Sequence, residues 1–271
     1  MKIHILGSCS GTEPMPRRHH TSLVVETAGN LYWFDVGENA AHTAYLMGLD
    51  VFRLQALFIS HPHIDHIGGL PPFLFLPHKL ASRQNRVFDH APPILLPEMA
   101  FWEGTLAMMR HVEIPCVSDD GQYLFPGGHA APVELLRDGT VFSDGHLAVE
   151  ARHNFHLGET PSPEDDRFHS YSFRLRADGK TVVVSGDVRS WRDMGDWLEQ
   201  PVDLLLMETG HHTPAQVCAE LKESRAPVAQ ILFYHHGRAL LEHYEETRRA
   251  AEDAWGKPLL IAEDATTYDL G

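Results

Sequence analysis

Short apolar runs of strand length alternate along this chain with segments whose apolar residues recur at helical spacing. The runs that predict strands are KIHIL at residues 2–6, TSLVVET at 21–27, LYWFDV at 31–36, ALFIS at 56–60, LAVEARHNF at 147–155, SYSFRLR at 170–176, TVVVSGD at 181–187, VDLLLMET at 202–209, VAQILFY at 228–234 and PLLIA at 258–262. Helices are expected over residues 39–49, from Glu98 to about His111, after Thr213-Pro214, and over 239–255. This repeated alternation of strands and helices predicts an α/β fold.

Residues 70–140 depart from the alternating pattern. Their segments LPPFLFLPHKL and PEMAFWEGTLAMMRHVEIP are rich in proline, aromatic residues and methionine. We interpret this stretch as an insertion, or cap, that packs over one end of the core, with ordinary core helices as the alternative. The length of 271 residues suits one large domain spanning residues 1–271.

The composition narrows the class of partner. The formal net charge is −15, and Arg17-Arg18 and Arg248-Arg249 are pairs rather than the basic stripe typical of proteins that bind long nucleic acids. The three cysteines form no CxxC pair, which argues against a disulfide framework or a cysteine-built zinc site. No apolar run reaches the roughly 18 residues of a membrane helix, and the N-terminal run is too short for a signal peptide. We therefore expect a cytoplasmic protein without a membrane partner.

The stretch SHPHIDHIGG at residues 60–69 follows a predicted buried strand and concentrates metal-binding side chains. Pro62 pushes His61 toward extended geometry, in which positions 61, 63 and 65 point to one side. If the chain turns at Asp65 and a helix starts there, His61 and His63 can serve one metal while Asp65 and His66 reach a second. Imidazole and carboxylate ligands suit zinc, with iron or manganese as alternatives. A solvated polar loop is the other interpretation.

This cluster supplies too few ligands, and the remainder should come from other strand ends, where α/β sites gather. In ARHNFHLG, His153 falls on the face shared with apolar residues and His156 on the other, so His156 is favoured as a ligand. Asp187 ends the run VVVSGD, where a simple turn carboxylate is the alternative. His235 and His236 both end the run ILFYHH, and one of them is expected to bind metal.

These motifs together resemble the metallo-β-lactamase fold hydrolases. The N-terminal stretch LGSCSGTEPMPRRHHTSLVVET, followed by LYWFDVGENAAH, is similar to the ribonuclease Z branch, as are HSYSFRL before VVVSGD and VDLLLMET after it. The resemblance covers nearly the whole chain except residues 70–140. It implies a four-layer αββα sandwich that carries two divalent metal ions, zinc in the first place and Mn²⁺ or Fe²⁺ otherwise.

The resemblance also assigns the ligands. It implies that one metal is held by His61, His63 and His156, that the other is held by Asp65, His66 and His235, and that Asp187 bridges the two. It places Asp35 behind the ligands, where it would orient them. Two such ions can share a water molecule and bring its pKa toward neutrality, so that no side-chain nucleophile is required.

The segment ETGHHT at residues 208–213 follows another predicted strand end. His211 and His212 could reach the metal rim and donate a proton to a leaving group, although exposed residues ahead of the Thr213 helix cap are the alternative. Asp65, Glu208 and His211 are therefore the candidate catalytic residues. The basic loop from Arg17 to His20 could approach an anionic substrate, or be solvated.

Two departures from ribonuclease Z bear on the substrate. That family usually grips transfer RNA with an arm between the third histidine and the bridging aspartate, whereas here LGETPSPEDDRF at residues 157–168 is short and acidic. The family's HEAT motif is also altered, with Met207 at its histidine position. We therefore expect a metallo-hydrolase whose substrate is a small anionic phosphodiester.

Two alternatives to this function remain. One is a ribonuclease Z-like tRNA 3′-processing endonuclease, in which nucleic acid would be the partner. The other is a metal-binding or sensor protein without turnover. Exposed aromatic residues within 70–140 would favour a homodimer.

Overall fold

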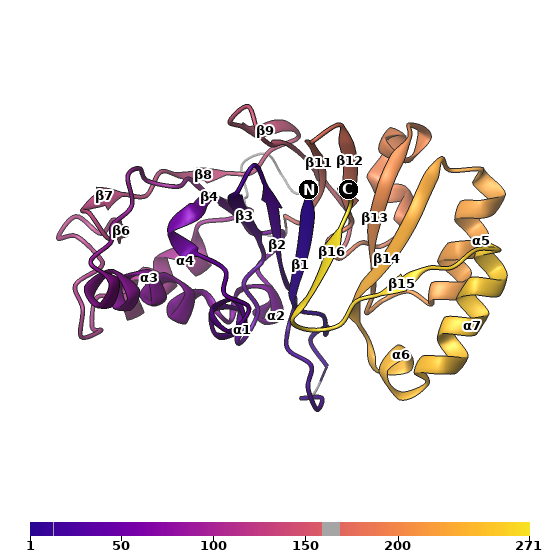
Figure 1. The fold of residues 1–271 in the computed structure, drawn as a ribbon, viewed down its shortest axis with the longest axis horizontal. Helices are drawn as coiled ribbons and strands as arrows, with labels where there is room; N and C mark the ends of the chain where they lie inside the picture. The colour runs from indigo at the N-terminus through magenta and orange to yellow at the C-terminus, as the bar shows by residue number, and fades with distance from the viewer. Residues whose placement is uncertain (13, 159–168) are drawn as a thin grey trace.

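Two large β-sheets form the centre of the computed structural model, which describes residues 1–12, 14–158 and 169–271. The first sheet has seven strands in the order β16-β1-β2-β3-β4-β5-β8 (Figure 1). Their bounds are β1 Lys2–Gly7, β2 Ser22–Thr27, β3 Asn30–Phe34, β4 Leu54–Phe58, β5 Ile94–Leu96, β8 Val133–Leu135 and β16 Thr266–Asp269.

The second sheet also has seven strands, in the order β15-β14-β13-β12-β11-β10-β9. Their bounds are β9 Gly139–Ser143, β10 Ala148–His153, β11 Tyr171–Ala177, β12 Lys180–Val184, β13 Val202–Thr209, β14 Val228–His236 and β15 Leu260–Ile261. A separate two-stranded sheet pairs β6 Leu124–Phe125 with β7 His129–Ala130.

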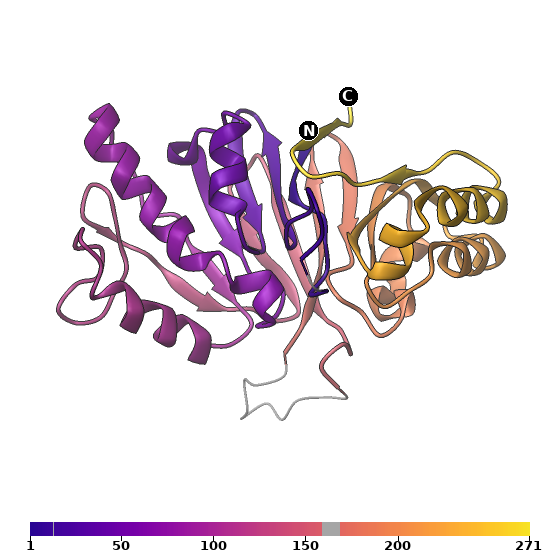
Figure 2. The ribbon, with the colours of Figure 1, turned by 90° about the horizontal axis from the view of Figure 1, so that it is seen from below.

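Helices flank the two sheets. Their bounds are α1 Ala40–Leu46, α2 Ile64–Ile67, α3 Leu70–Gln84, α4 Ala100–Met109, α5 Pro214–Ser224, α6 Arg238–Glu242 and α7 Tyr244–Trp255, with 3₁₀ helices η1 Val51–Arg53 and η2 Trp191–Glu199. Figure 2 shows the helices of the N-terminal half on one outer side, those of the C-terminal half on the other, and the strands between them. None of the helices in the described ranges is long and apolar enough to cross a membrane.

The alternation of side chains along each strand produces three apolar layers. Ile3, Phe34 and Phe58 of the first sheet pack in the central layer with side chains of the second, such as Phe173 and Leu206. The intervening residues point outward, because successive side chains of a strand face opposite sides. Both faces of each sheet are therefore buried, which explains why the strands read as continuous apolar runs.

The two outer apolar layers bind the helices to the sheets. Trp33 and Leu57 pack with Phe73 of α3 and Trp102 of α4 on the first sheet. On the second sheet, outward side chains of β13 and β14 pack with those of α5, α7 and η2, including Leu205, Phe233, Val217 and Trp255. The resulting order of layers is helix, sheet, sheet, helix, as the αββα sandwich requires.

Most predicted elements are present, with corrections at three places. LPPFLFLPHKL belongs to a helix, α3, because two of its prolines lie in the first turn, where no backbone donor is lost, although Pro77 lies inside. The helix expected over 239–255 is divided at His243, whose φ of −126° is not helical. A strand beyond PLLIA, β16, pairs with β1 across most of the chain length.

Residues 70–140 contribute to the first sheet as well as covering it. β5 pairs in parallel with β4, and β8 pairs in parallel with β5. α4 occupies the predicted range between Glu98 and His111. Side chains of α3 and α4 cover the outer face of this sheet. The treatment of residues 1–271 as one domain with an insertion stays a prediction.

Candidate metal centre

The HxHxDH motif begins two residues after β4 and ends in the short helix α2. His63 has extended backbone angles, φ −69° and ψ 147°, and the helix starts at the next residue, one position before the predicted turn. Asp65 and His66 are thereby rotated away from the line of His61 and His63. His61, Asp65 and His66 are buried, whereas His63 remains exposed to the pocket.

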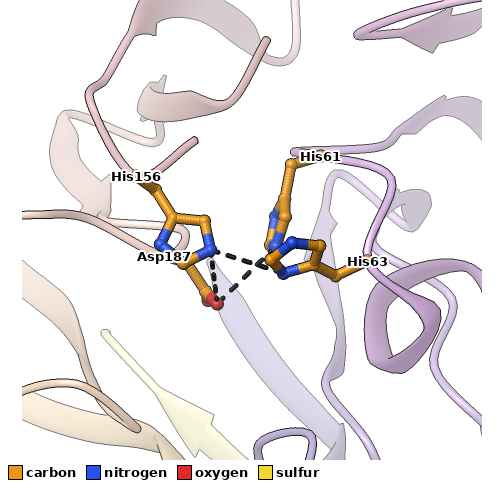
Figure 3. A group of neighbouring side chains, drawn as sticks. All are labelled: His61, His63, His156 and Asp187. Atoms are coloured by element: carbon orange, nitrogen blue, oxygen red, sulfur yellow. Dashed lines mark hydrogen bonds and ion pairs between the residues drawn. The ribbon is translucent and has the colours of Figure 1, made fainter. Parts of the chain in front are cut away.

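The structure brings the predicted ligands together in two groups. His61, His63, His156 and Asp187 offer ligand atoms that all lie within 4.8 Å of one another, and so do Asp65, His66 and His235. Figure 3 shows His61 and His63 facing His156 and Asp187, which come from the second sheet. Asp65 and His66 lie in α2 just beyond β4, and His235 lies near the end of β14, so the groups lie where the two sheets meet.

Asp187 faces both groups. Its Oδ2 lies 3.6 Å from Nε2 of His61, 3.6 Å from Nε2 of His156 and 3.2 Å from Nε2 of His235. Its Oδ1 lies 3.4 Å from Nε2 of His66. This placement matches the bridging position that the resemblance implies.

The distances between the candidate ligand atoms, and the buried polar atoms without hydrogen-bond partners among the described residues, both fit a metal ion. Two ligands about 2.1 Å from a tetrahedral zinc ion are about 3.4 Å apart, which is close to the separations around Asp187. Nε2 of His61, Nε2 of His66 and Oδ1 of Asp187 are buried without a hydrogen-bond partner in the described part of the chain. Such atoms are costly unless a further group satisfies them. The donor set, imidazole with carboxylate, is that of zinc and related divalent ions.

The far side of each buried ring is held by a hydrogen bond that fixes its tautomer. Nδ1 of His66 donates to Oδ2 of Asp35 at 2.8 Å. Nδ1 of His61 donates to Oγ of Ser60 at 3.0 Å, and that hydroxyl donates to Asp35 at 2.8 Å. Each Nε2 therefore keeps its lone pair toward the centre, as a metal ligand requires. The predicted role of Asp35 behind the ligands agrees with these contacts.

Ser60 and Thr21 are parts of the site that the sequence pattern did not predict. Nδ1 of His235 donates to Oγ1 of Thr21 at 2.6 Å, and Thr21 donates to the carbonyl of Cys9 at 3.1 Å. Ser60 directly precedes His61, which was the available signal. Thr21 lies far from His235 in sequence, at the start of β2, and carried none.

The structure also separates the histidine pairs that sequence left open. His156 lies in the first group, while the ring of His153 packs against Phe155 and His169, with centroids 5.7 and 5.6 Å away. His235 lies in the second group. Both ring nitrogens of His236 instead form hydrogen bonds, with Oγ1 of Thr209 and the carbonyl of Ala262, each at 2.9 Å.

A bulge in β14 explains why adjacent histidines point differently. Glu208 pairs with Tyr234, but Thr209 pairs with His236, so His235 is an extra residue in the ladder. Its φ of 50° lies in the left-handed region. Bulges redirect side chains next to active sites, and the strain they hold is typical of such positions.

The ionisation of the site favours bound cations. Burial alone would raise the pKa of Asp187, but the neighbouring His235 and His66 hold it well below its usual range. Burial lowers the pKa of His61 well below 6.5, and burial lowers the pKa of His156 to about 4. The carboxylate is therefore charged, and His61 and His156 are neutral, as metal ligands must be. Although burial lowers the pKa of His66, Asp187 and Asp35 raise it well above 6.5, so a metal ion would displace a proton from this ring.

The candidate catalytic pair lies at the edge of this centre. Glu208 is buried and accepts hydrogen bonds from the backbone N–H of His211 at 2.9 Å and from its Nδ1 at 3.0 Å. The hydrogen bond to Glu208 raises the pKa of His211. The His211 ring stacks 6.2 Å from that of His235 and is half exposed, so it can meet a substrate at the centre. His211 also lies close enough to Asp187 and His235 to form a third ligand group with them.

The pocket above the centre is small and polar. It has a volume of about 340 Å³ and is lined by Ser10, Gly11, Thr12, His63, Asp65, Asp187, Gly210, His211 and His235. These lining residues include no lysine or arginine. Arg17 and Arg18 line another cavity with Glu263 and Asp264, and Arg18 donates to Ser8 and Ala262. The acidic segment 157–168 lies almost entirely outside the described residues.

A family model described as "Anti-Pycsar protein Apyc1" matches residues 1–266. The chain belongs to this family. Ribonuclease Z of Shouchella clausii is 27% identical over 314 aligned positions, covering 100% of this chain and 97% of that protein. Ribonuclease Z of Treponema pallidum is 39% identical over 93 residues, which cover 34% of this chain and only 29% of that protein.

Solved structures agree with the fold of this Apyc1 family member. The metallo-β-lactamase fold protein YhfI of Bacillus subtilis superposes with a TM-score of 0.73 at 17% identity, over 98% of both chains. The short form of human tRNase Z gives 0.68 at 20% identity over the full length of both chains. A diphosphatase of the PhnP family gives 0.65 at 15% identity, over 99% of this chain and 97% of that one. The chain thus has the metallo-β-lactamase fold.

Proposed function

We propose that this protein is a metal-dependent phosphodiesterase that hydrolyses a small substrate. The observation that carries the proposal is the polar pocket of about 340 Å³, into which members of both candidate ligand groups and His211 face. A pocket of this size accommodates a compact diester rather than a folded RNA. The family's description, "Anti-Pycsar protein Apyc1", names an antagonist. Cleavage of a small molecule is one chemistry by which an antagonist could act.

In this proposal the seven predicted ligands hold two divalent ions, zinc in the first place. Bound divalent ions would lower the pKa of water and stabilise negative charge on the phosphoryl oxygens. The protein's own contribution is to hold the ligand side chains in fixed orientations. Asp35, Ser60 and Thr21 hold the Nδ1 protons of three rings, so that the neutral rings of His66, His61 and His235 would present their Nε2 lone pairs to a metal.

The leaving group would take its proton from His211. Hydrolysis adds a water oxygen to phosphorus and breaks the bond to one ester oxygen, which leaves as an alcohol after it is protonated. Glu208 holds Nδ1–H of His211 and favours the protonated ring, so Nε2–H can be the donor. The products are a phosphomonoester and an alcohol. Asp65 stays a ligand whose carboxylate borders the same pocket.

The test is a hydrolysis assay on bis(p-nitrophenyl) phosphate and on a 3′,5′-cyclic mononucleotide as a compact natural diester. Activity should disappear after treatment with a chelator and return with zinc or manganese. The monoester p-nitrophenyl phosphate serves as the control and should be a poorer substrate. Absence of turnover on protein shown by elemental analysis to hold two metals would exclude this function.

The second candidate is a tRNA 3′-processing endonuclease. The observations in its favour are the similarity to ribonuclease Z proteins and the full-length superposition on human tRNase Z. The acidic segment 157–168 and the net charge of −15 oppose binding to a polyanion. Incubation with precursor tRNA at low salt, where attraction to phosphates is strongest, would separate the two functions on a gel. Cleavage at the 3′ end there would support the endonuclease.

A further inference from the structure

A second cavity lies beside the metal pocket at the carboxyl end of β13. It has a volume of about 490 Å³ and opens between the start of α5 and the helices α6 and α7. Its walls are formed by Thr209, His212, Thr213, Pro214, Ala215, Ala239, Leu240, His243, Glu246, Thr247 and Ala250. This volume lies in the range of pockets that bind small molecules.

The cavity is separate from the metal pocket. One segment, residues 209–213, divides the two, and each residue of it lines only one side. Gly210 and His211 line the metal pocket, whereas Thr209, His212 and Thr213 line the second cavity. The two spaces have no lining residue in common, so the second cavity is not an extension of the first.

The walls suit a flat apolar ring. Three alanines, at positions 215, 239 and 250, stand where larger side chains would fill the space between the helices. Pro214 and Leu240 are buried and give the cavity an apolar floor. A planar aromatic ring buries a large area with little loss of conformational entropy, so it gains much from such an apolar space.

The polar groups of the cavity favour hydrogen-bond donors and oppose anions. Glu246 is exposed and has no hydrogen bond or ion pair with the residues that the structure describes. Nε2 of His212 donates to the carbonyl of Val188 at 2.9 Å, so its Nδ1 is an acceptor in the neutral ring. No lysine or arginine is among the lining residues, and the carboxylate of Glu246 would repel a phosphate.

We infer that this cavity is a second small-molecule site, which binds an uncharged heteroaromatic ring bearing an amino group. The ring packs against Pro214, Leu240 and the three alanines, and the amino group donates to Glu246. Binding at this site requires neither turnover nor substrate at the metal centre. Its test can therefore succeed or fail independently of the proposed phosphodiesterase.

Adenosine is a suitable probe, because it is uncharged and carries an amino-substituted ring. Saturation-transfer NMR and calorimetry on the metal-loaded protein should detect binding with a dissociation constant on the order of 0.1–1 mM. Ribose, which lacks the ring, and benzoate, which is anionic and lacks the donor, should not bind. Inorganic phosphate, which is drawn to the metal centre, should not displace adenosine.

Variants on α7 locate the site. Ala250→Phe places a ring into the cavity from an exposed position and should weaken binding by about tenfold or more, because buried ring contacts are lost. Glu246→Gln should weaken it by about threefold, because a charge-assisted hydrogen bond becomes a neutral one. Asp253→Asn, with the same change of charge on the same helix outside the cavity, should leave it unchanged. No binding of adenosine at 10 mM (roughly ten times the weakest expected constant), or binding that both cavity variants leave unaltered, would overturn the inference.

Discussion

At the scale of single residues, the candidate metal centre depends on side chains that are not themselves candidate ligands. A zinc ligand must present a lone pair, and each buried imidazole here does so because its other nitrogen has a fixed acceptor. The residues HxHxDH, Asp187 and the strand-end histidines could be predicted from sequence, because metal-binding side chains are rare at such density. Thr21 could not, because its role depends on a contact with a residue 214 positions away.

Thr21→Val tests this dependence. Valine has nearly the same shape but cannot accept the hydrogen bond from Nδ1 of His235, so the ring is free to adopt the other tautomer. We expect metal affinity to fall by about 10–100-fold, as measured by competition with a chromogenic chelator. Thr43→Val, at a buried threonine of α1, is the matched control. Equal affinity in Thr21→Val and wild type would show that this hydrogen bond does not position the ligand.

His211→Ala tests the proton donor. An alcohol of high pKa leaves slowly without a proton, whereas p-nitrophenolate leaves readily without one. We expect the variant to lose about 10²–10³-fold in kcat on a diester with an alkyl leaving group and much less on bis(p-nitrophenyl) phosphate. His243→Ala, at an exposed histidine outside the metal pocket, should change neither rate. A loss of the same size on both substrates would argue for a role in binding instead.

At the scale of elements, local signals predicted strands and helices better than the contacts between them. Strands of the second sheet could be read as apolar runs because both of their faces are buried. β16 was missed because it is short, has alternating exposure and is defined by its pairing with β1. α3 was missed because proline argues against a helix unless the first turn can be located.

The close packing at the start of α3 gives an element-scale prediction. A Cβ at Gly69 would lie 2.1 Å from the carbonyl oxygen of Gly37, which belongs to the loop behind the metal centre. Gly69→Ala should therefore destabilise the fold by about 1–3 kcal/mol or more, measured by urea unfolding.

Gly104→Ala is the control for that measurement. Gly104 lies inside α4 and has open space around an added Cβ. The substitution should be neutral or stabilise the protein by about 0.5–1 kcal/mol, because alanine favours the helix. A Gly69→Ala variant as stable as wild type would contradict the packing argument.

At the scale of the whole molecule, the two ligand groups join the two sheets. His61, His63, Asp65 and His66 follow β4 of the first sheet. His156 and Asp187 follow strands of the second sheet, and His235 lies near the end of β14 in that sheet. Bound metals would therefore act as cross-links between two layers whose shared core is apolar. The substrate could not be predicted at this scale, since it depends on the shape of the pocket.

Removal of metal should accordingly lower the thermal midpoint while leaving the secondary structure in place. A ligand that binds only the folded state stabilises it by mass action, and the apolar core remains when the metal is gone. Differential scanning fluorimetry with and without a chelator gives the midpoint, and far-UV circular dichroism gives the secondary structure. A midpoint that is insensitive to the chelator and to added zinc would count against an intrinsic metal centre.

The position of Asp35 has a consequence for how the metals are loaded. One carboxylate holds His66 of one group directly and His61 of the other through Ser60. Fixing either histidine therefore fixes the hydrogen-bond partner of the other, and the second ion enters a site that the first has already ordered. Titration of the metal-free protein should then show positive cooperativity, with a Hill coefficient above 1. In Asp35→Asn this positive cooperativity should decrease.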